Sequence, residues 1–356
     1  SMISGMIWAG LACGMAAGGD SLSIDGYEFA LIGDPGNRDT NEFEVPFFPD
    51  ERIGGVDSEY HMATTEVSVG QYFEFVEAYY PFYVKNTGSD IGFTWFTGLG
   101  IRAAFGQVHI LDGISPHRVA DMSWEYAARY IKWLHHGKVN EEWAFNTGVY
   151  DASTFAQDDD GNWQHQLQRS SRARFFMPTL DKWTKGAHWD PNKGGGVGGY
   201  WRFPNGSNIE SQPGHPDEGG ERNAGESPAF PIGVGSYPDV KSPWGMLDKA
   251  GGQSEMTETA RRSSFPEVRR LCGSAFFNDS FGDPFLADQL GFAREQSWYP
   301  SEGLRLATLS PSHSADLNLD GRIDFFDISF FAQLFFSDDD RWDIDDIHVF
   351  LELMKM

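Results

Sequence analysis

The 356-residue chain contains only two cysteines, Cys13 and Cys272. Two cysteines cannot build a secreted disulfide scaffold or a four-cysteine zinc site, so we exclude both. Basic residues are also scarce, because 27 Lys and Arg stand against 52 Asp and Glu and give a formal net charge of −25. A nucleic-acid backbone is bound by a basic face, so this charge argues against a nucleic-acid partner.

Long apolar runs are missing as well. No stretch reaches the roughly 18–20 apolar residues of a membrane span, so we expect none. The start of the chain, from Met2 to Ala17, is apolar and ends in small residues. This pattern is typical of a secretory signal peptide, although the basic region that opens such peptides is missing. We therefore predict a leader at residues 1–20 and a secreted, extracellular bacterial protein; a buried first segment of the mature fold is the alternative.

The composition of the remainder indicates one large domain followed by a small module. Hydrophobic residues make up 40% of the chain, which allows a sizeable core, and 41 glycines and 18 prolines indicate many loops. Beyond the Ser/Pro segment at 310–314 the composition changes, since residues 314–356 hold 11 acidic against 3 basic residues. We place the domains at 21–309 and 314–356.

The stretch Ser242–Thr259 carries the most specific pattern. Its glycines allow positive φ, and an Asp and a Glu follow a Pro-aromatic-Gly start. It resembles the Pro-(Phe/Tyr/Trp)-Gly-Leu-x-Asp-x-x-Gly-Asn-Val-Trp-Glu-Trp signature of the formylglycine-generating enzyme family, the sulfatase-modifying factors. The matching residues are Pro243, Trp244, Gly245, Asp248, Gly251 and Glu255.

Further segments follow the order of the same family between Ile24 and Thr308. Each carries part of a family motif, and three of them also predict helices, capped or begun at Ser68, Ser123 and Thr179. The segments are Glu66–Phe75, Val119–Leu134, Phe176–Trp183, Leu271–Ala275 and Gly303–Ala307. The stretch Gly194–Glu226 is rich in Gly, Asn and Pro, and we expect a long surface loop there.

The resemblance implies an irregular, loop-rich α+β fold related to C-type lectins, in which Glu255 is structural. It also implies a structural calcium ion near Gly252 and Ser254, where this chain departs from the signature. The family's chemistry is the oxidation of sulfatase cysteines on copper(I) held by a cysteine pair beyond the Gly-Gly-Ser strand. Residues 275–284 contain no cysteine, which argues against copper, and we expect Cys272 to be a buried apolar residue.

Histidines offer no clear ligand set. His135 and His136 are adjacent and cannot share one face of a helix, and we expect His188 and His215 at the surface.

The acidic tail contains a loop with oxygen ligands at positions 1, 3, 5, 9 and 12 and Gly at position 6. This spacing wraps a chain around calcium. The expected ligands are Asp316, Asn318, Asp320, the carbonyl of Arg322, Asp324 and Asp327. The loop resembles that of a dockerin, a calcium-binding module that docks secreted proteins onto cohesin-like partners. A second loop near residues 335–346 is degenerate, so we predict one firm calcium site.

These observations favour a non-catalytic binding or scaffold protein tethered through the dockerin-like module. The alternatives are a formylglycine-generating oxidase and an accessory protein in polysaccharide processing, with an extracellular glycan or protein as ligand. The candidate ligand-binding residues are Trp95, Tyr200 and Trp201.

Overall fold

The computed structural model describes residues 22–45, 50–90, 98, 100–104, 106–155, 158–159, 166–171, 173–262, 265–276, 286 and 302–309. Its main sheet has five antiparallel strands in the order β1–β2–β3–β11–β6. They are β1 (Leu22–Ile24), β2 (Tyr27–Ile32), β3 (Tyr60–Ala63), β11 (Ala307–Thr308) and β6 (Phe175–Phe176). Because β11 lies between β3 and β6, the segment just before it, with Arg305, is held in the interior.

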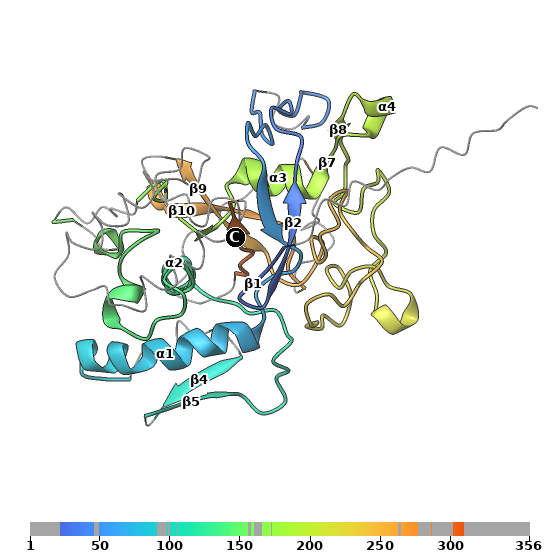
Figure 1. Ribbon diagram of the computed structural model, residues 1–356. Helices are drawn as coiled ribbons and strands as arrows, with labels where there is room; N and C mark the ends of the chain where they lie inside the picture. Colours follow the sequence, from blue (N-terminus) through green and yellow to red (C-terminus); the bar gives the residue numbers. More distant parts are fainter. Residues whose placement is uncertain are drawn as a thin grey trace, which may run out of the picture.

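Helix α1 (Val69–Thr87) begins as the sequence predicts. The Ser68 hydroxyl accepts from the Gln71 backbone N–H, and the Gln71 side chain accepts from the Ser68 N–H, which completes a capping box. One face of α1 is buried against helix α2 (Trp124–His135), where the ring of Tyr130 meets the rings of Tyr72 and Phe75 at centroid distances of 5.6 and 5.5 Å. Figure 1 shows the hairpin of β4 (Ile101–Ala104) and β5 (Gln107–Ile110) beside α1.

The third predicted helix is α3 (Leu180–His188). The Thr179 hydroxyl caps it by accepting from the Lys182 N–H at 3.2 Å. The chain continues into β7 (Trp189–Asp190), α4 (Lys193–Gly196) and β8 (Gly199–Tyr200), and β7 pairs with β8. The expectation of a single surface loop from Gly194 onward is therefore wrong at its start, because the Tyr200 side chain is buried there.

A long hairpin joins β9 (Glu255–Arg262) and β10 (Phe265–Cys272), with Cys272 opposite Glu255. The strand expected at Leu271–Ala275 ends earlier, because Gly273 has a φ of 74°. The remaining elements are the 3₁₀ turns η2 (Glu142–Phe145), η3 (Ala152–Thr154) and η4 (Pro216–Glu218).

This mixture of a few helices and small antiparallel sheets confirms the α+β expectation for the main domain. The expected leader at 1–20 and the dockerin-like module at 314–356 lie outside the described residues. No helix in the described ranges combines the length and apolar content needed to cross a bilayer.

Candidate functional site

The predicted ligand-binding aromatics do not form one surface. Trp95 lies outside the described residues. Tyr200 is only 2% exposed and so provides no exposed ring. Trp201 is half-buried; its indole N–H donates to Asp190 at 3.1 Å, and the Lys193 ammonium lies 4.1 Å from its ring centre. Ligand binding by Trp201 stays a prediction.

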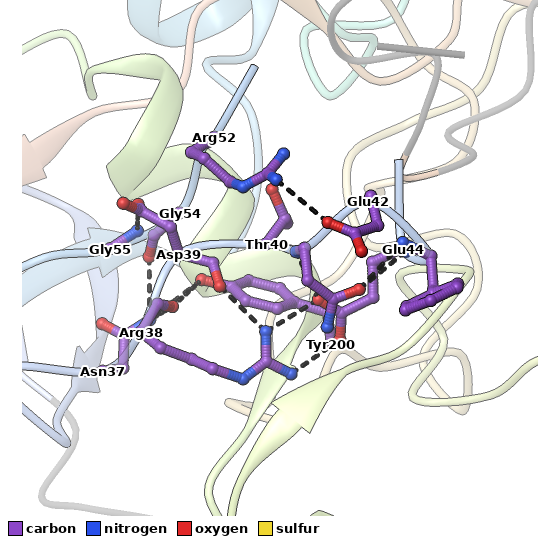
Figure 2. Close-up of polar contacts among 12 residues, drawn as sticks. Asn37, Arg38, Asp39, Thr40, Glu42, Glu44, Arg52, Gly54, Gly55 and Tyr200 are labelled. Carbon is purple, nitrogen blue, oxygen red and sulfur yellow. Dashed lines mark hydrogen bonds and ion pairs between the residues drawn. The ribbon is translucent and has the colours of Figure 1, made fainter. Parts of the chain in front are cut away.

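Tyr200 is buried because two segments, residues 37–45 and 50–55, lie against it (Figure 2). Its hydroxyl donates to the Arg38 carbonyl at 2.8 Å and accepts from the Asn37 amide at 3.0 Å. Gly54 has a φ of 93°, and a Cβ atom there would lie 2.3 Å from the Tyr200 hydroxyl. Only glycine fits this approach without displacing the ring. Burial raises the pKa of Tyr200, so its hydroxyl stays neutral and serves as a structural hydrogen-bonding group.

An ionic network is buried at the centre of the domain. Arg305 binds Glu255 through two nitrogens, with Nε–Oε2 at 2.9 Å and Nη2–Oε1 at 2.7 Å. Both side chains are almost completely buried, at 0% and 1% exposed. Glu255 also accepts from the Trp183 indole at 2.5 Å and from the Lys249 ammonium at 3.3 Å. The expected structural role of Glu255 rested on analogy, and these contacts give it a physical basis.

The network joins segments that are far apart in the sequence. Arg305 Nη1 donates to the Ala63 carbonyl at the end of β3, and Nη2 donates to the Leu247 carbonyl of the signature stretch. Glu66, from the opening motif, accepts from the Gln253 N–H at 3.0 Å. Residues from the opening motif, the signature stretch and the terminal strand thus meet at one place.

The electrostatics of the network are uneven. Burial raises the pKa of Glu255, but the charges of Arg305 and Lys249 outweigh burial and leave that pKa below its usual value. Burial and the Arg305 charge lower the pKa of Lys249 to about 7. Burial, with the Glu255 charge nearby, raises the pKa of Glu66 well above its usual value, which favours the neutral carboxyl. Sequence reasoning missed Glu66, Lys249 and Arg305 as one cluster.

Cys272 lies against this network and not at the surface. Its side chain is buried, as the sequence predicts, and it is the one cysteine within the described part of the chain. Burial and the nearby Glu255 charge raise the pKa of its thiol well above the usual value. A raised pKa keeps the thiol protonated, and a protonated thiol is a weak nucleophile and a weak metal ligand because both roles need the thiolate.

The histidines differ in burial. His188 was expected at the surface but is buried, because α3 turns it inward to place Nδ1 3.1 Å from the Trp201 carbonyl. His215 is exposed and stacks on Phe230. In the described ranges, no group of three or more His, Cys, Asp or Glu side chains is arranged to hold a metal ion. The expected C-terminal calcium ligands lie outside those ranges: Asp316, Asn318, Asp320, Arg322, Asp324 and Asp327.

Comparison with known proteins adds the family. A family model described as "Sulfatase-modifying factor enzyme 1-like domain" matches residues 20–307. A solved structure titled "Crystal Structure of CarF" is 16% identical over 80% of this chain and 98% of that one, with a TM-score of 0.45. No curated protein matches the chain. Because the family match covers well over half of the sequence, the chain belongs to the family of sulfatase-modifying factor enzyme 1-like domains.

Proposed function

We propose that this chain is a non-catalytic member of its family, a secreted binding or scaffold protein. The observation that carries the proposal is the state of Cys272: a single thiol, 1% exposed, with a raised pKa. The sequence places no other cysteine after Gly273, where the family's resemblance implies the reactive pair.

Copper(I) is the metal that the resemblance implies, and the residues around Cys272 do not fit it. Copper(I) is held by soft ligands, and two thiolates are the set implied here. Cys272 supplies one protonated thiol beside the ammonium of Lys249 and the carboxylate of Glu255. A carboxylate is a hard ligand that binds copper(I) weakly, and a neighbouring ammonium repels a metal cation. We derive no copper-dependent step for this chain.

The signature residues have a different use in this proposal. Glu255 pairs with Arg305, and Arg305 also donates to the backbone carbonyls of Ala63 and Leu247, so both charges are engaged inside the domain. Such a fixed interior supports variable surface loops, and binding through those loops is a natural use of the fold, argued by analogy. Trp201 remains the candidate contact residue.

The second part of the proposal concerns the tail. The loop Asp316–Asp327 has the ligand spacing of a calcium site, and it supports tethering through a dockerin-like module to a cohesin-like partner. An accessory role in polysaccharide processing fits the same tether. Pull-down with cohesin-like modules, with and without a calcium chelator, tests it; no calcium-dependent capture would count against tethering.

The test of the main proposal is mass spectrometry of a sulfatase-type Cys-x-Pro-x-Arg peptide. The peptide is incubated with the full chain, copper(I), a reductant and oxygen, and with an active family member as positive control. We expect no cysteine-to-formylglycine conversion by this chain. A Cys272→Ser variant is the matched control, because conversion that depends on Cys272 would identify an oxidase that works with one chain thiol.

A further inference from the structure

A small pocket lies between the loop that carries Asn205 and Glu221 and the segment from Tyr237 to Ala250, which includes Asp248. It leaves about 10 Å³ for the centre of a water-sized sphere. This is room for one water or one ion and too little for an organic ligand. The pocket is separate from the thiol of Cys272 and from the aromatic candidates of the binding surface.

Two of its lining residues carry buried oxygens that have no hydrogen-bond partner, Asn205 Oδ1 and Asp248 Oδ1. The Asn205 amide is oriented by its nitrogen, which donates to the Ile209 carbonyl at 3.0 Å and the Ser211 hydroxyl at 3.1 Å. Asp248 is 5% exposed, and its other oxygen, Oδ2, accepts from the Gly235 N–H at 2.5 Å. Buried acceptors are rarely left without a partner, so both oxygens call for one.

The possible donors that line the pocket are engaged elsewhere. The Lys249 ammonium lies 3.3 Å from Glu255 and 3.6 Å from the Met62 sulfur. The Tyr237 hydroxyl donates to the Gly214 carbonyl at 2.9 Å. A species that satisfies both oxygens therefore comes from outside the chain, and it presents either positive charge or hydrogen-bond donors.

Charge favours a cation. Glu221 also lines the pocket, at its exposed side, and one of its carboxylate oxygens accepts from the Gln212 N–H at 2.8 Å. Glu221 therefore adds a second carboxylate to the lining of the pocket.

We propose that this pocket binds one Ca²⁺ ion, with Asp248 and Asn205 as buried ligands and Glu221 at the open side. All three offer hard oxygens, which calcium prefers, and water completes the coordination. Calcium accepts irregular oxygen sets, whereas Mg²⁺ demands a near-ideal octahedron that three side chains on separate loops do not impose. The site differs from the C-terminal loop and does not use Gly252 or Ser254.

The test uses the full chain with the C-terminal loop silenced by Asp316→Ala and Asp320→Ala, so that calorimetry with Ca²⁺ no longer reports that loop and the pocket variants identify binding at the pocket. Asp248→Asn removes one charge and keeps an acceptor for the Gly235 N–H. Asn also tolerates the φ of 57° at this position. We expect one bound Ca²⁺ with a Kd below about 1 mM. We also expect at least about a tenfold weaker Kd in Asp248→Asn, since ligand charge sets calcium affinity.

Two further variants keep the test decisive. Glu221→Gln is exposed and leaves the fold intact, so it gives a several-fold weaker Kd even if Asp248→Asn fails to fold. Glu28→Gln, an exposed acid on β2, is the matched control and leaves the Kd unchanged. Either of two results overturns the proposal: a loop-silenced chain that binds no Ca²⁺ up to about 10 mM, or Asp248→Asn and Glu221→Gln chains that bind it like their parent. The pocket would then hold water.

Discussion

Glu255→Gln is the substitution whose effect follows most directly from the structure. The amide keeps the shape of the carboxylate and still accepts from the Trp183 indole, but it removes the negative charge between Arg305 and Lys249. Arg305 then stays charged at 0% exposed, because the guanidinium does not release its proton. The variant therefore isolates the cost of one buried, unpaired cation.

The magnitude follows from how well Arg305 is otherwise satisfied. Breaking a buried ion pair by removing one partner costs about 3–5 kcal/mol. Two of the Arg305 nitrogens keep their carbonyl acceptors at Ala63 and Leu247, and Lys249 can lose its proton because its pKa is already about 7. Both relaxations favour the lower end, so we expect a loss of about 3 kcal/mol in the free energy of unfolding. That is a large part of the roughly 5–15 kcal/mol typical of a domain.

Urea unfolding at pH 7 measures this loss. With a slope of about 3 kcal/mol/M, the midpoint of Glu255→Gln falls by about 1 M while the slope stays the same. The matched control is Glu44→Gln. Glu44 pairs with both terminal nitrogens of Arg38, whose side chain is 45% exposed, so this control removes the charge from an ion pair near the surface. We expect that control to lose at most about 1 kcal/mol, as surface pairs do. Equal losses in the two variants would refute the claim that the buried pair of Glu255 and Arg305 stabilises the domain more than a surface pair does.

Three other substitutions test the interior. Glu66→Gln keeps an acceptor for the Gln253 N–H. Because the pKa of Glu66 is higher in the folded than in the unfolded chain, the parent loses up to about 1.4 kcal/mol of folding stability per pH unit above 4.5, the pKa of the unfolded carboxyl. The stability of Glu66→Gln relative to the parent, followed by urea midpoints, should therefore grow as the pH rises from 4.5. A difference that stays constant with pH would contradict the raised pKa of Glu66. Lys249→Met should be most stable relative to the parent below pH 7, and this gain in stability should shrink as the pH rises from 7 toward 10.5. In that window only the unfolded lysine holds its proton, so the parent becomes more stable as the pH rises. Thermal unfolding between pH 6 and 10 checks the direction, and no trend would count against the lowered pKa of Lys249. Gly54→Ala should cost about 2 kcal/mol, from a positive φ and the Tyr200 hydroxyl 2.3 Å from the new Cβ; a midpoint equal to that of the parent would show that the segment 50–55 does not lie against the ring.

Local features were predictable from the sequence because they depend on neighbours in the chain. The Ser68 and Thr179 caps satisfy backbone N–H groups three residues away, and the apolar spacing after Ser123 needs only the helical period. The burial of Cys272 was predictable because a lone cysteine on a strand behaves as a small apolar residue.

Features that depend on distant partners were not predictable in the same way. The pairing of Glu255 with Arg305 requires β11 to insert between β3 and β6, which no local pattern signals. Tyr200 and His188 were misplaced at the surface, because Tyr200 is covered by the segment with Asn37 and Arg38 and His188 faces the Trp201 backbone. The family signature was the one signal that joined Glu255 to a structural role.

The central claim, that this family member does not oxidise sulfatase cysteines, is tested most directly by the peptide assay. The full chain, copper(I), reductant and oxygen are incubated with the Cys-x-Pro-x-Arg peptide, and the peptide mass is followed beside that from an active family member. We predict an unchanged cysteine with this chain and complete conversion with the control. Formylglycine formed by this chain and lost in Cys272→Ser would contradict the claim.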